Sequence, residues 1–348
     1  MTTRRDVLVA GLANSLAGGP ARGLARGLAS GLTAGLAGSA PLALAQSASS
    51  WPEGPVKIVV PFAAGNAADV LTRLVAEKLA ARLGQPFVVE NKVGAGGLLG
   101  MEAVRTSKPD GHTIVSATIG TLAINQFLFK KMPHDPEADF ACASLIWENC
   151  NVFVVQPQHP AKTLQELIAW SRAKPKGANI GTSALGSSPY LASVLFRTRT
   201  GIPGQEIPFP SGSQSLTALI GGDTDFAIDN IASCLPLLRA GRVRALAVTA
   251  DYRWPVLPDV PTTTEAGVPD FVLTSWGALA VPKATPAAIV EKLSAAVQAV
   301  AADPATQQRF MDAGAKFVTS SPARTTAFAA SERAKWKEAV QVSGAKLD

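Results

Sequence analysis

Along residues 56–129, short apolar runs typical of strands alternate with segments in which apolar residues recur at helical spacing. Residues 56–60 form a short apolar run typical of a buried strand, and small residues fill 61–68. A helix is predicted from about Asp69, with apolar residues at helical spacing and Gly84 as its stop: Leu71, Leu74, Val75, Leu79 and Leu83. The same order recurs as strand 87–90 with helix 98–107, and as strand 113–117 with a helix to about 129. This alternation predicts a parallel, doubly wound α/β sheet with helices on both faces.

A second set of elements follows. It comprises a strand at 151–155, a helix opened by the capping box Thr163–Glu166, a strand at 179–182, helices opened by Ser188 and Ser211, and strands at 225–228 and 244–249. After a proline-rich passage at 255–269, a strand at 279–281 and helices from 285, 304 and 321 complete the chain. Because block 156–250 stands between two halves of another set, we expect two α/β domains of mixed, mostly parallel sheets. Domain 1 would be 51–155 with 251–348, domain 2 would be 156–250, and the ligand cleft would lie between them.

The first 45 residues are interpreted as an export signal. Arg4 and Arg5 form a twin-arginine pattern, a weakly apolar Gly-Leu-Ala-rich run follows, and Ala43-Leu44-Ala45 is a cleavage pattern. Pro20, Arg22, Arg26 and many glycines interrupt the run, so it is a poor membrane anchor. We therefore expect a periplasmic protein, exported by the twin-arginine route.

Composition narrows the function classes. Half of the formal net charge of +6 lies in the first 45 residues, and Lys and Arg do not cluster elsewhere, so nucleic-acid binding is not expected. The three cysteines, Cys142, Cys150 and Cys234, leave at least one thiol unpaired, and whether two of them form a disulfide stays open. Neither they nor the three histidines have metal-ligand spacing, and no metal or cofactor is expected.

Two loops of similar design are the main candidates for ligand binding. Each follows a strand and opens a helix, so unpaired backbone N–H groups and the helix dipole favour an anion there. The first loop contributes Phe62, Ala64, Gly65, Asn66 and Ala67, and the second contributes Ser183, Ser187 and Ser188. Asp69 would repel an anion and is interpreted as a helix cap paired with Arg73.

Weaker candidates lie at the ends of neighbouring elements. They are Thr118 and Thr121 after the third strand, Ser211 and Ser213 at a helix start, and Asp229 at a strand end, where it could hold an ammonium, a hydroxyl or water. The glycine-rich loop 94–97 lacks both nucleotide-binding patterns and is interpreted as a tight bend.

These motifs, in this order, resemble the Bug (TctC-like) family, the periplasmic substrate-binding proteins of tripartite tricarboxylate transporters. The resemblance covers nearly all of the chain after the signal. It rests on Pro61–Gly65 with Asp69 and Arg73, Val89–Lys92, Gly94–Gly97, Pro109–Gly111, Gly186–Ser188, Gly221-Gly222, Ile228–Asn230, Leu246–Thr249, Pro258–Thr262, Glu265–Gly267 and Trp276.

The resemblance implies a two-domain, type II Venus-flytrap binding protein, acting as a monomer. Such a protein captures a small organic acid and delivers it to transmembrane permease subunits. An alternative is an orphan sensor that presents its closed form to a signalling receptor. Asn66, Ala184, Tyr190 and Phe209–Gly212 depart from the family pattern, so the ligand of a relative does not transfer.

An exported enzyme is the remaining alternative. Gly181 and Ser183 partly match a nucleophile elbow, but Leu185 stands where the second glycine is needed. No histidine lies late in the chain, where a hydrolase of that type would place it. We therefore expect a binding protein with no catalytic residues.

Overall fold

The computed structural model describes residues 50–343 and 346. The expected export signal, residues 1–45, lies outside the described residues. Within them, no helix combines the length and apolar character needed to cross a membrane.

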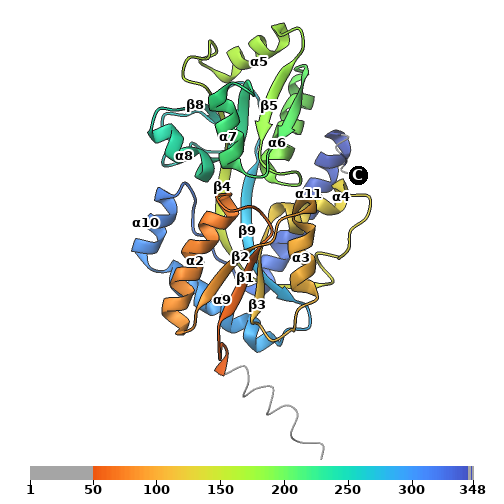
Figure 1. Ribbon diagram of the computed structural model, residues 1–348, viewed down its shortest axis with the longest axis vertical. Helices are drawn as coiled ribbons and strands as arrows, with labels where there is room; N and C mark the ends of the chain where they lie inside the picture. Colours follow the sequence, from red (N-terminus) through yellow and green to blue (C-terminus); the bar gives the residue numbers. More distant parts are fainter. Residues whose placement is uncertain (1–49, 344–345, 347–348) are drawn as a thin grey trace, which may run out of the picture. The chain divides into compact units, whose positions relative to one another are not determined.

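The first half of the fold is a five-stranded sheet in the order β2-β1-β3-β9-β4. Its strands are β1 (Val56–Val60), β2 (Phe87–Asn91), β3 (Thr113–Thr118), β9 (Thr274–Pro282) and the first part of β4 (Phe140–Val155). β1 is parallel to β2 and β3, whereas β9 is antiparallel to β3 and β4. Around it lie α2 (Ala67–Leu83), α3 (Leu98–Arg105), α4 (Asn125–Leu128), α9 (Ala287–Ala301), α10 (Pro304–Asp312) and α11 (Pro322–Ser343). Figure 1 shows α2 and α3 beside β1–β3.

The second half is built on the remainder of β4. β7 (Phe226–Asn230) and β8 (Arg244–Val248) are antiparallel to β4, and β5 (Ala178–Thr182) is parallel to β7 and to β6 (Gly204–Pro208). Its helices are α5 (Leu164–Ala173), α6 (Ser188–Thr200), α7 (Gly212–Gly221) and α8 (Ile231–Arg239). Parallel and antiparallel pairings are therefore both prominent in the described sheet.

One long strand joins the two halves. β4 spans 16 residues, pairs with β9 through Cys150, and pairs with β7 from Asn151 onward. The predicted strand at 151–155 is only its last part, and the predicted strand at 279–281 is one third of β9. Both strands are nearly continuously buried, with polar residues at the centre of β4 and at the start of β9, so their sequence shows no alternation and no clear start.

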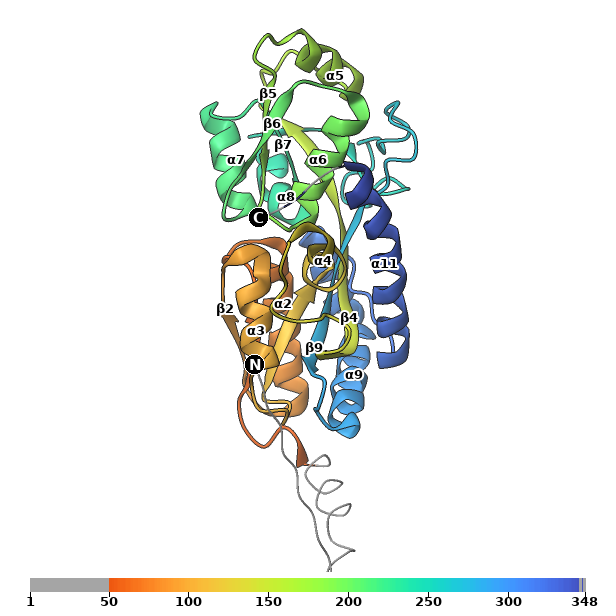
Figure 2. The ribbon, with the colours of Figure 1, turned by 90° about the vertical axis from the view of Figure 1, so that its right-hand side faces the viewer.

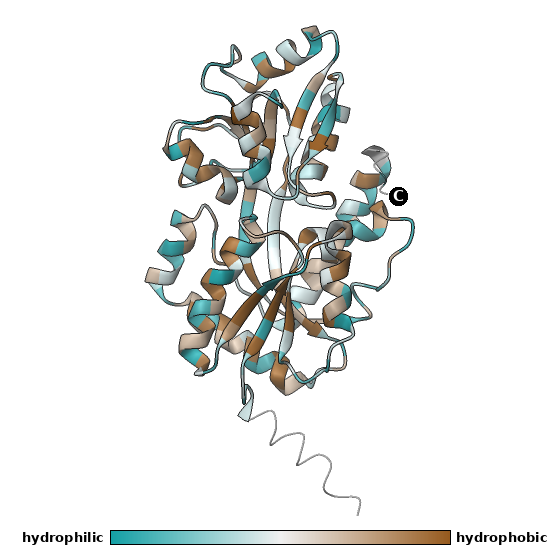
Figure 3. Ribbon diagram, viewed as in Figure 1, coloured by the Kyte–Doolittle hydropathy of each residue, from teal (hydrophilic) through white to brown (hydrophobic). Residues whose placement is uncertain are grey.

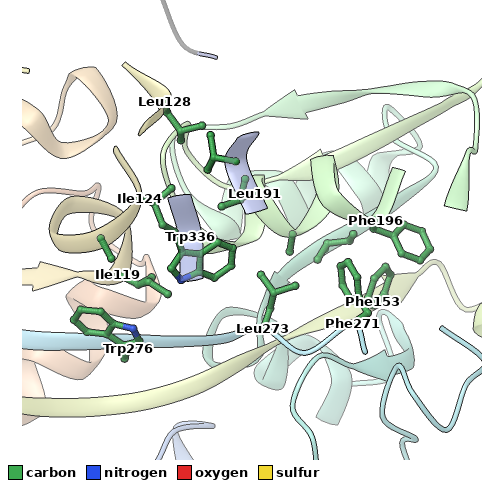
Figure 4. Packing of buried hydrophobic residues seen from close by; sticks show 14 of the residues in the cluster. Ile119, Ile124, Leu128, Phe153, Leu191, Phe196, Phe271, Leu273, Trp276 and Trp336 are labelled. Atoms are coloured by element: carbon green, nitrogen blue, oxygen red, sulfur yellow. The ribbon is translucent and has the colours of Figure 1, made fainter. Parts of the chain in front are cut away.

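The segment between β8 and β9, residues 249–273, packs on the second half almost to the start of β9, whereas the sequence placed it in the first half from residue 251. The Leu273 N–H donates to the Thr249 carbonyl at 2.8 Å, and Phe271 packs on Phe153 and Phe196. Figure 4 shows these rings together at one end of a cluster that reaches Trp276 and Trp336 at the other. The core is therefore continuous along β4.

Helix α11 packs against both halves, since it contacts α9 and β4 as well as α6. Figure 2 shows it running beside β4 and β9. The Glu332 carboxylate on this helix accepts from the indole Nε1 of Trp276 at 3.0 Å and of Trp336 at 3.1 Å. These bonds fix α11 to the strand that leads back into the first half.

Hydropathy follows this architecture. The strands β1–β3 are mostly brown in Figure 3, and the outer faces of the surrounding helices carry much of the teal. Cys142, Cys150 and Cys234 are all buried, unpaired thiols, and burial raises the pKa of Cys142 to about 11. Among the described residues no group of three or more His, Cys, Asp or Glu side chains is arranged to hold a metal ion.

Candidate functional site

The loop after β1 starts a helix earlier than its sequence suggests. Asn66, with extended backbone angles, is the N-cap of α2, and its Oδ1 accepts from the Ala68 N–H at 3.0 Å. The prediction of Asp69 as the cap was wrong, because asparagine three residues earlier already satisfies the first turn. Gly65 turns the chain into the cap with a φ of 78°, a conformation that favours glycine.

Asp69 instead holds the loop against its neighbours. Its carboxylate accepts from the Gly65 N–H at 3.1 Å, from Arg73 Nε at 3.0 Å and from Asn91 Nδ2 at 2.8 Å. Burial acts to raise the pKa of Asp69, but the bonds from Arg73, Asn91 and Gly65 outweigh it and hold the pKa below its usual value. The expected pairing with Arg73 is confirmed. The Asp69 carboxylate therefore stabilises the loop through hydrogen bonds within the protein.

The loop after β5 has the same design. Gly186 has a φ of 75°, and Ser187 caps α6 by accepting from the Tyr190 N–H at 3.4 Å. The prediction of Ser188 as the cap is therefore off by one residue, because the turn at Gly186 gives Ser187 the extended angles of an N-cap. The Ser183 and Ser187 hydroxyls are 3.2 Å apart, and the Ser188 hydroxyl lies 3.5 Å from Asn230 Nδ2.

The two loops meet across a small pocket. It has a volume of about 10 Å³, close to the space that one water needs. Its lining comes from both halves of the fold: Phe62, Asn66, Ala68, Thr118, Ile119, Trp147, Ser187, Ser188, Asn230 and Ser275. The described lining carries no charged side chain, so its polar groups are hydroxyls, amides, an indole and backbone.

Five predicted site residues line this pocket, namely Phe62, Asn66, Thr118, Ser187 and Ser188. Others support it without lining it. Ser183 bonds to Ser187, and Thr121 Oγ1 accepts from the Thr118 N–H at 3.0 Å. The segment that holds Thr121 is a π-helical turn, η2 (Gly120–Ile124), rather than the predicted loop.

The remaining predicted residues lie farther out or beneath. Ala64 and Gly65 are exposed, and Ala67 is the first residue of α2. Ser211 caps α7 by accepting from the Gln214 N–H and lies 2.9 Å from the Ser213 hydroxyl. A Cβ on Gly65 would lie 3.5 Å from Ser213 Oγ, so these two positions face each other across the junction of the halves.

Asp229 lies beneath the start of α7 and not in the pocket lining. Its Oδ1 accepts from the Asn230 N–H at 2.8 Å, while Oδ2 is buried without a partner among the described residues. Burial raises the pKa of Asp229 to about 7, against the opposing effect of hydrogen bonds from Asn230 and Ser183. The proposed contact of Asp229 with ligand stays a prediction, as do the other site assignments.

Sequence reasoning missed Ala68, Ile119, Trp147, Asn230 and Ser275 as lining residues. Trp147 and Ser275 come from β4 and β9, whose passage between the halves was not predicted. Asn230 stood in a recognised motif beside Asp229, and a strand-end asparagine next to a helix start was the signal that could have selected it.

The backbones of the two halves approach closely beside the pocket. A Cβ on Gly120 would lie 2.1 Å from the Gly186 carbonyl oxygen, and one on Gly186 would lie 3.3 Å from the Gly96 oxygen. Glycine at 120 therefore permits a contact between the π-helical turn of one half and the serine loop of the other. This contact describes a closed cleft.

Two α/β halves joined by crossing strands over a polar cleft are the architecture of solute-binding proteins. The chain belongs to the tripartite tricarboxylate transporter receptor family, TctC, whose model matches residues 71–345. This confirms the resemblance and the two-domain binding-protein fold. Because the family is one of receptors, it also supports a binding protein over an enzyme.

Individual relatives and solved structures agree with this family assignment. The chain is 34% identical to protein BugT of Bordetella pertussis over 310 residues, which is 89% of this chain and 95% of the relative. The solved structure of Rpa4515 of R. palustris with adipate matches at a TM-score of 0.83, with 34% identity over 85% of this chain and all of that one. MatC of Rhodopseudomonas palustris with bound malate matches at 0.79, with 33% identity over 83% of this chain and all of that one.

Proposed function

We propose that this protein captures a small organic carboxylate between its two halves and delivers it to transmembrane permease subunits. The observation that carries this proposal is the meeting of two helix starts, those of α2 and α6, at one pocket built from both halves. The N-cap residues, Asn66 and Ser187, each occupy one first-turn N–H. The Ala67 and Asp69 N–H groups of α2 stay free of helical partners, whereas α6 offers only the Ser188 N–H, because Pro189 has none. Such donors, with the helix dipole, suit an anion.

The neutral lining supports hydrogen bonding as the means of holding the carboxylate. Asp69 and Arg73 are paired with each other near the first loop, so neither places a net charge in the pocket. Hydrogen bonds to an ionised acceptor are about twice as strong as neutral ones, which suits an anion in a site without a cation. Adipate and malate, bound to the two R. palustris relatives, are acids of the proposed class.

Capture and release would follow from hinge motion. The division into two domains, predicted as 51–155 with 251–348 and 156–250, remains our proposal. The pairing of Asn151 with β7 and of Leu273 with Thr249 favours crossings near residues 150 and 273. The pocket is too small for any organic acid in the closed form described here, so binding requires the halves to separate and close again. Periplasmic location and twin-arginine export complete the proposal, together with action as a monomer.

A thermal-shift screen of the mature chain tests this function. The panel contains organic acids, the matching neutral amides and cationic controls. At least one acid should raise the unfolding midpoint in a concentration-dependent way, because a ligand that binds only the folded state stabilises it by mass action. Stabilisation by amides or cations alone would show that the site is not a carboxylate site.

A deletion strain tests delivery. Loss of uptake of the stabilising acid, restored by the gene, is expected for a transport receptor. Unchanged uptake with a lost transcriptional response to the same acid would contradict delivery and favour sensing.

A further inference from the structure

The floor of the pocket is formed where β4 and β9 run side by side. In this antiparallel pair Trp147 lies opposite Gly277, and Asn149 lies opposite Ser275. Residues directly opposite, and residues two apart on one strand, share a face of the sheet. Trp147, Asn149 and Ser275 are therefore on one face, and two of them, Trp147 and Ser275, line the pocket.

The indole of Trp147 lies flat on Gly277. A Cβ built at position 277 would be 2.3 Å from Cε2, 2.5 Å from Cζ2 and 2.5 Å from Nε1 of this ring. Any side chain at 277 would displace the indole, so the absence of one is what allows the ring to cover the floor. Only 1% of Trp147 is exposed.

Three buried hydrogen-bond donors on β4 have no acceptor in the described chain, and one of them, Trp147, lines the pocket. The buried Trp147 Nε1, Asn149 Nδ2 and Asn151 Nδ2 all lack a partner. The two asparagines are tied to the pocket through Asn230, whose Nδ2 donates to Asn149 Oδ1 at 3.2 Å and to Asn151 Oδ1 at 2.8 Å. Buried donors in native proteins are almost always paired, so a group of three beside a ligand pocket indicates an acceptor supplied by the ligand.

Two other buried indoles also lack an acceptor, but they lie elsewhere. Trp51 packs against Gly111, and Trp254 stacks on Tyr252. Neither lines the pocket. Trp254 therefore provides a matched control for the same chemical change.

We propose that Trp147 determines specificity by donating its Nε1–H to a second oxygen of the ligand, remote from the carboxylate held by the two helix starts. The ligand is then an acid with a further acceptor oxygen, from a second carboxylate, a hydroxyl or a keto group. Asn149 and Asn151, which are bonded to the lining residue Asn230, keep two further donors behind the pocket wall. This inference rests on the proposed function, since the first carboxylate is the one assigned to the loops.

Calorimetry with acids matched in length tests the inference. The pairs are succinate with butyrate, glutarate with pentanoate and adipate with hexanoate, while lactate and pyruvate are compared with propanoate to separate hydroxyl and keto oxygens from carboxylate. In at least one pair, the parent protein should bind the acid with the further acceptor oxygen about tenfold more tightly than the acid without it. A buried hydrogen bond to such an oxygen changes affinity by about that factor.

Trp147→Phe keeps a ring on Gly277 and removes the donor. It should weaken binding of the preferred acid about tenfold and leave its partner unchanged, while Trp254→Phe should change neither. Unchanged binding of the preferred acid by Trp147→Phe would overturn the inference, as would equal binding of both members by the parent. If no acid of either kind binds, the proposed function fails as well, so the two failures are distinguishable.

A measurement on the parent protein covers the case in which Trp147→Phe does not fold. With ¹⁵N-labelled tryptophan, the Trp147 indole signal is assigned by replacing the other tryptophans with phenylalanine one at a time. Binding of the preferred acid should move this signal downfield and slow its exchange with solvent. An indole signal that does not respond would contradict the inference.

Discussion

Gly120→Ala should keep the protein folded while impairing closure of the cleft. The new Cβ would be 2.1 Å from the Gly186 carbonyl oxygen, whereas ordinary contacts begin at 3.4 Å, so the halves must move apart by about 1.3 Å at this point. Gly186 cannot readily yield, because it has a positive φ and is itself packed near Gly96 and Asn125. Gly120 has no positive φ, so alanine fits its backbone.

The size of the effect follows from the cost of overpacking. Inserting one methyl group into a closely packed contact costs about 1–3 kcal/mol. If the liganded form brings Gly120 as near to Gly186 as the form described does, that cost lowers affinity roughly fivefold to a hundredfold.

Calorimetry with the acid found in the thermal-shift screen measures this loss, and small-angle scattering shows whether the liganded variant still contracts. Gly221→Ala is the control, since its Cβ would meet only Asp223 Oδ2 at 3.7 Å. It should bind as the parent does. Parent-like affinity and contraction in Gly120→Ala would refute the link between this contact and ligand capture.

Three further predictions concern pH, the first loop and salt. The pKa of Asp229 is raised to about 7 in the folded protein, so its contribution to stability is fully present below about pH 4 and is lost as pH rises to about 7, by roughly 4 kcal/mol. Asp229→Asn should therefore flatten this part of the profile of melting temperature against pH. An unchanged slope would contradict the raised pKa of the buried Asp229 carboxyl. Asn66→Gly should leave the melting temperature nearly unchanged, since glycine is a tolerable N-cap that costs a few tenths of a kcal/mol, but should alter affinity; an unchanged dissociation constant removes Asn66 from the site. Because no charged side chain lines the described pocket, affinity should change less than about twofold between 0.05 and 0.5 M NaCl, and a tenfold loss would reveal an ion pair.

The sequence was most informative where helices and strands alternate. The strands β1, β3 and β5, the helices after them and the two facing loops all follow from local patterns of apolar and small residues. The strand β6 had no such signal, because its sequence GQEIP contains one large apolar residue, Ile207, and none of its five residues is fully buried. The helix caps lie earlier than predicted: Asn66 takes the cap position three residues before Asp69, and Ser187 takes it one residue before Ser188.

The floor of the pocket could not be predicted in this way. Trp147, Asn149 and Ser275 meet because two distant segments pair in a register that neither segment encodes by itself. The same holds for the approach of Gly120 to Gly186, which depends on the closure of one half on the other. Local pattern locates the loops, whereas long-range pairing decides which side chains meet between them.

Calorimetric titration of the mature protein with its best-stabilising acid, and with the amide of that acid, tests carboxylate capture most directly. We predict one site per chain and an amide that binds at least about tenfold more weakly, because the neutral group forfeits charge-assisted hydrogen bonds at the two helix starts. Equal affinity for acid and amide, or no binding heat with any acid that the screen contains, would contradict the account.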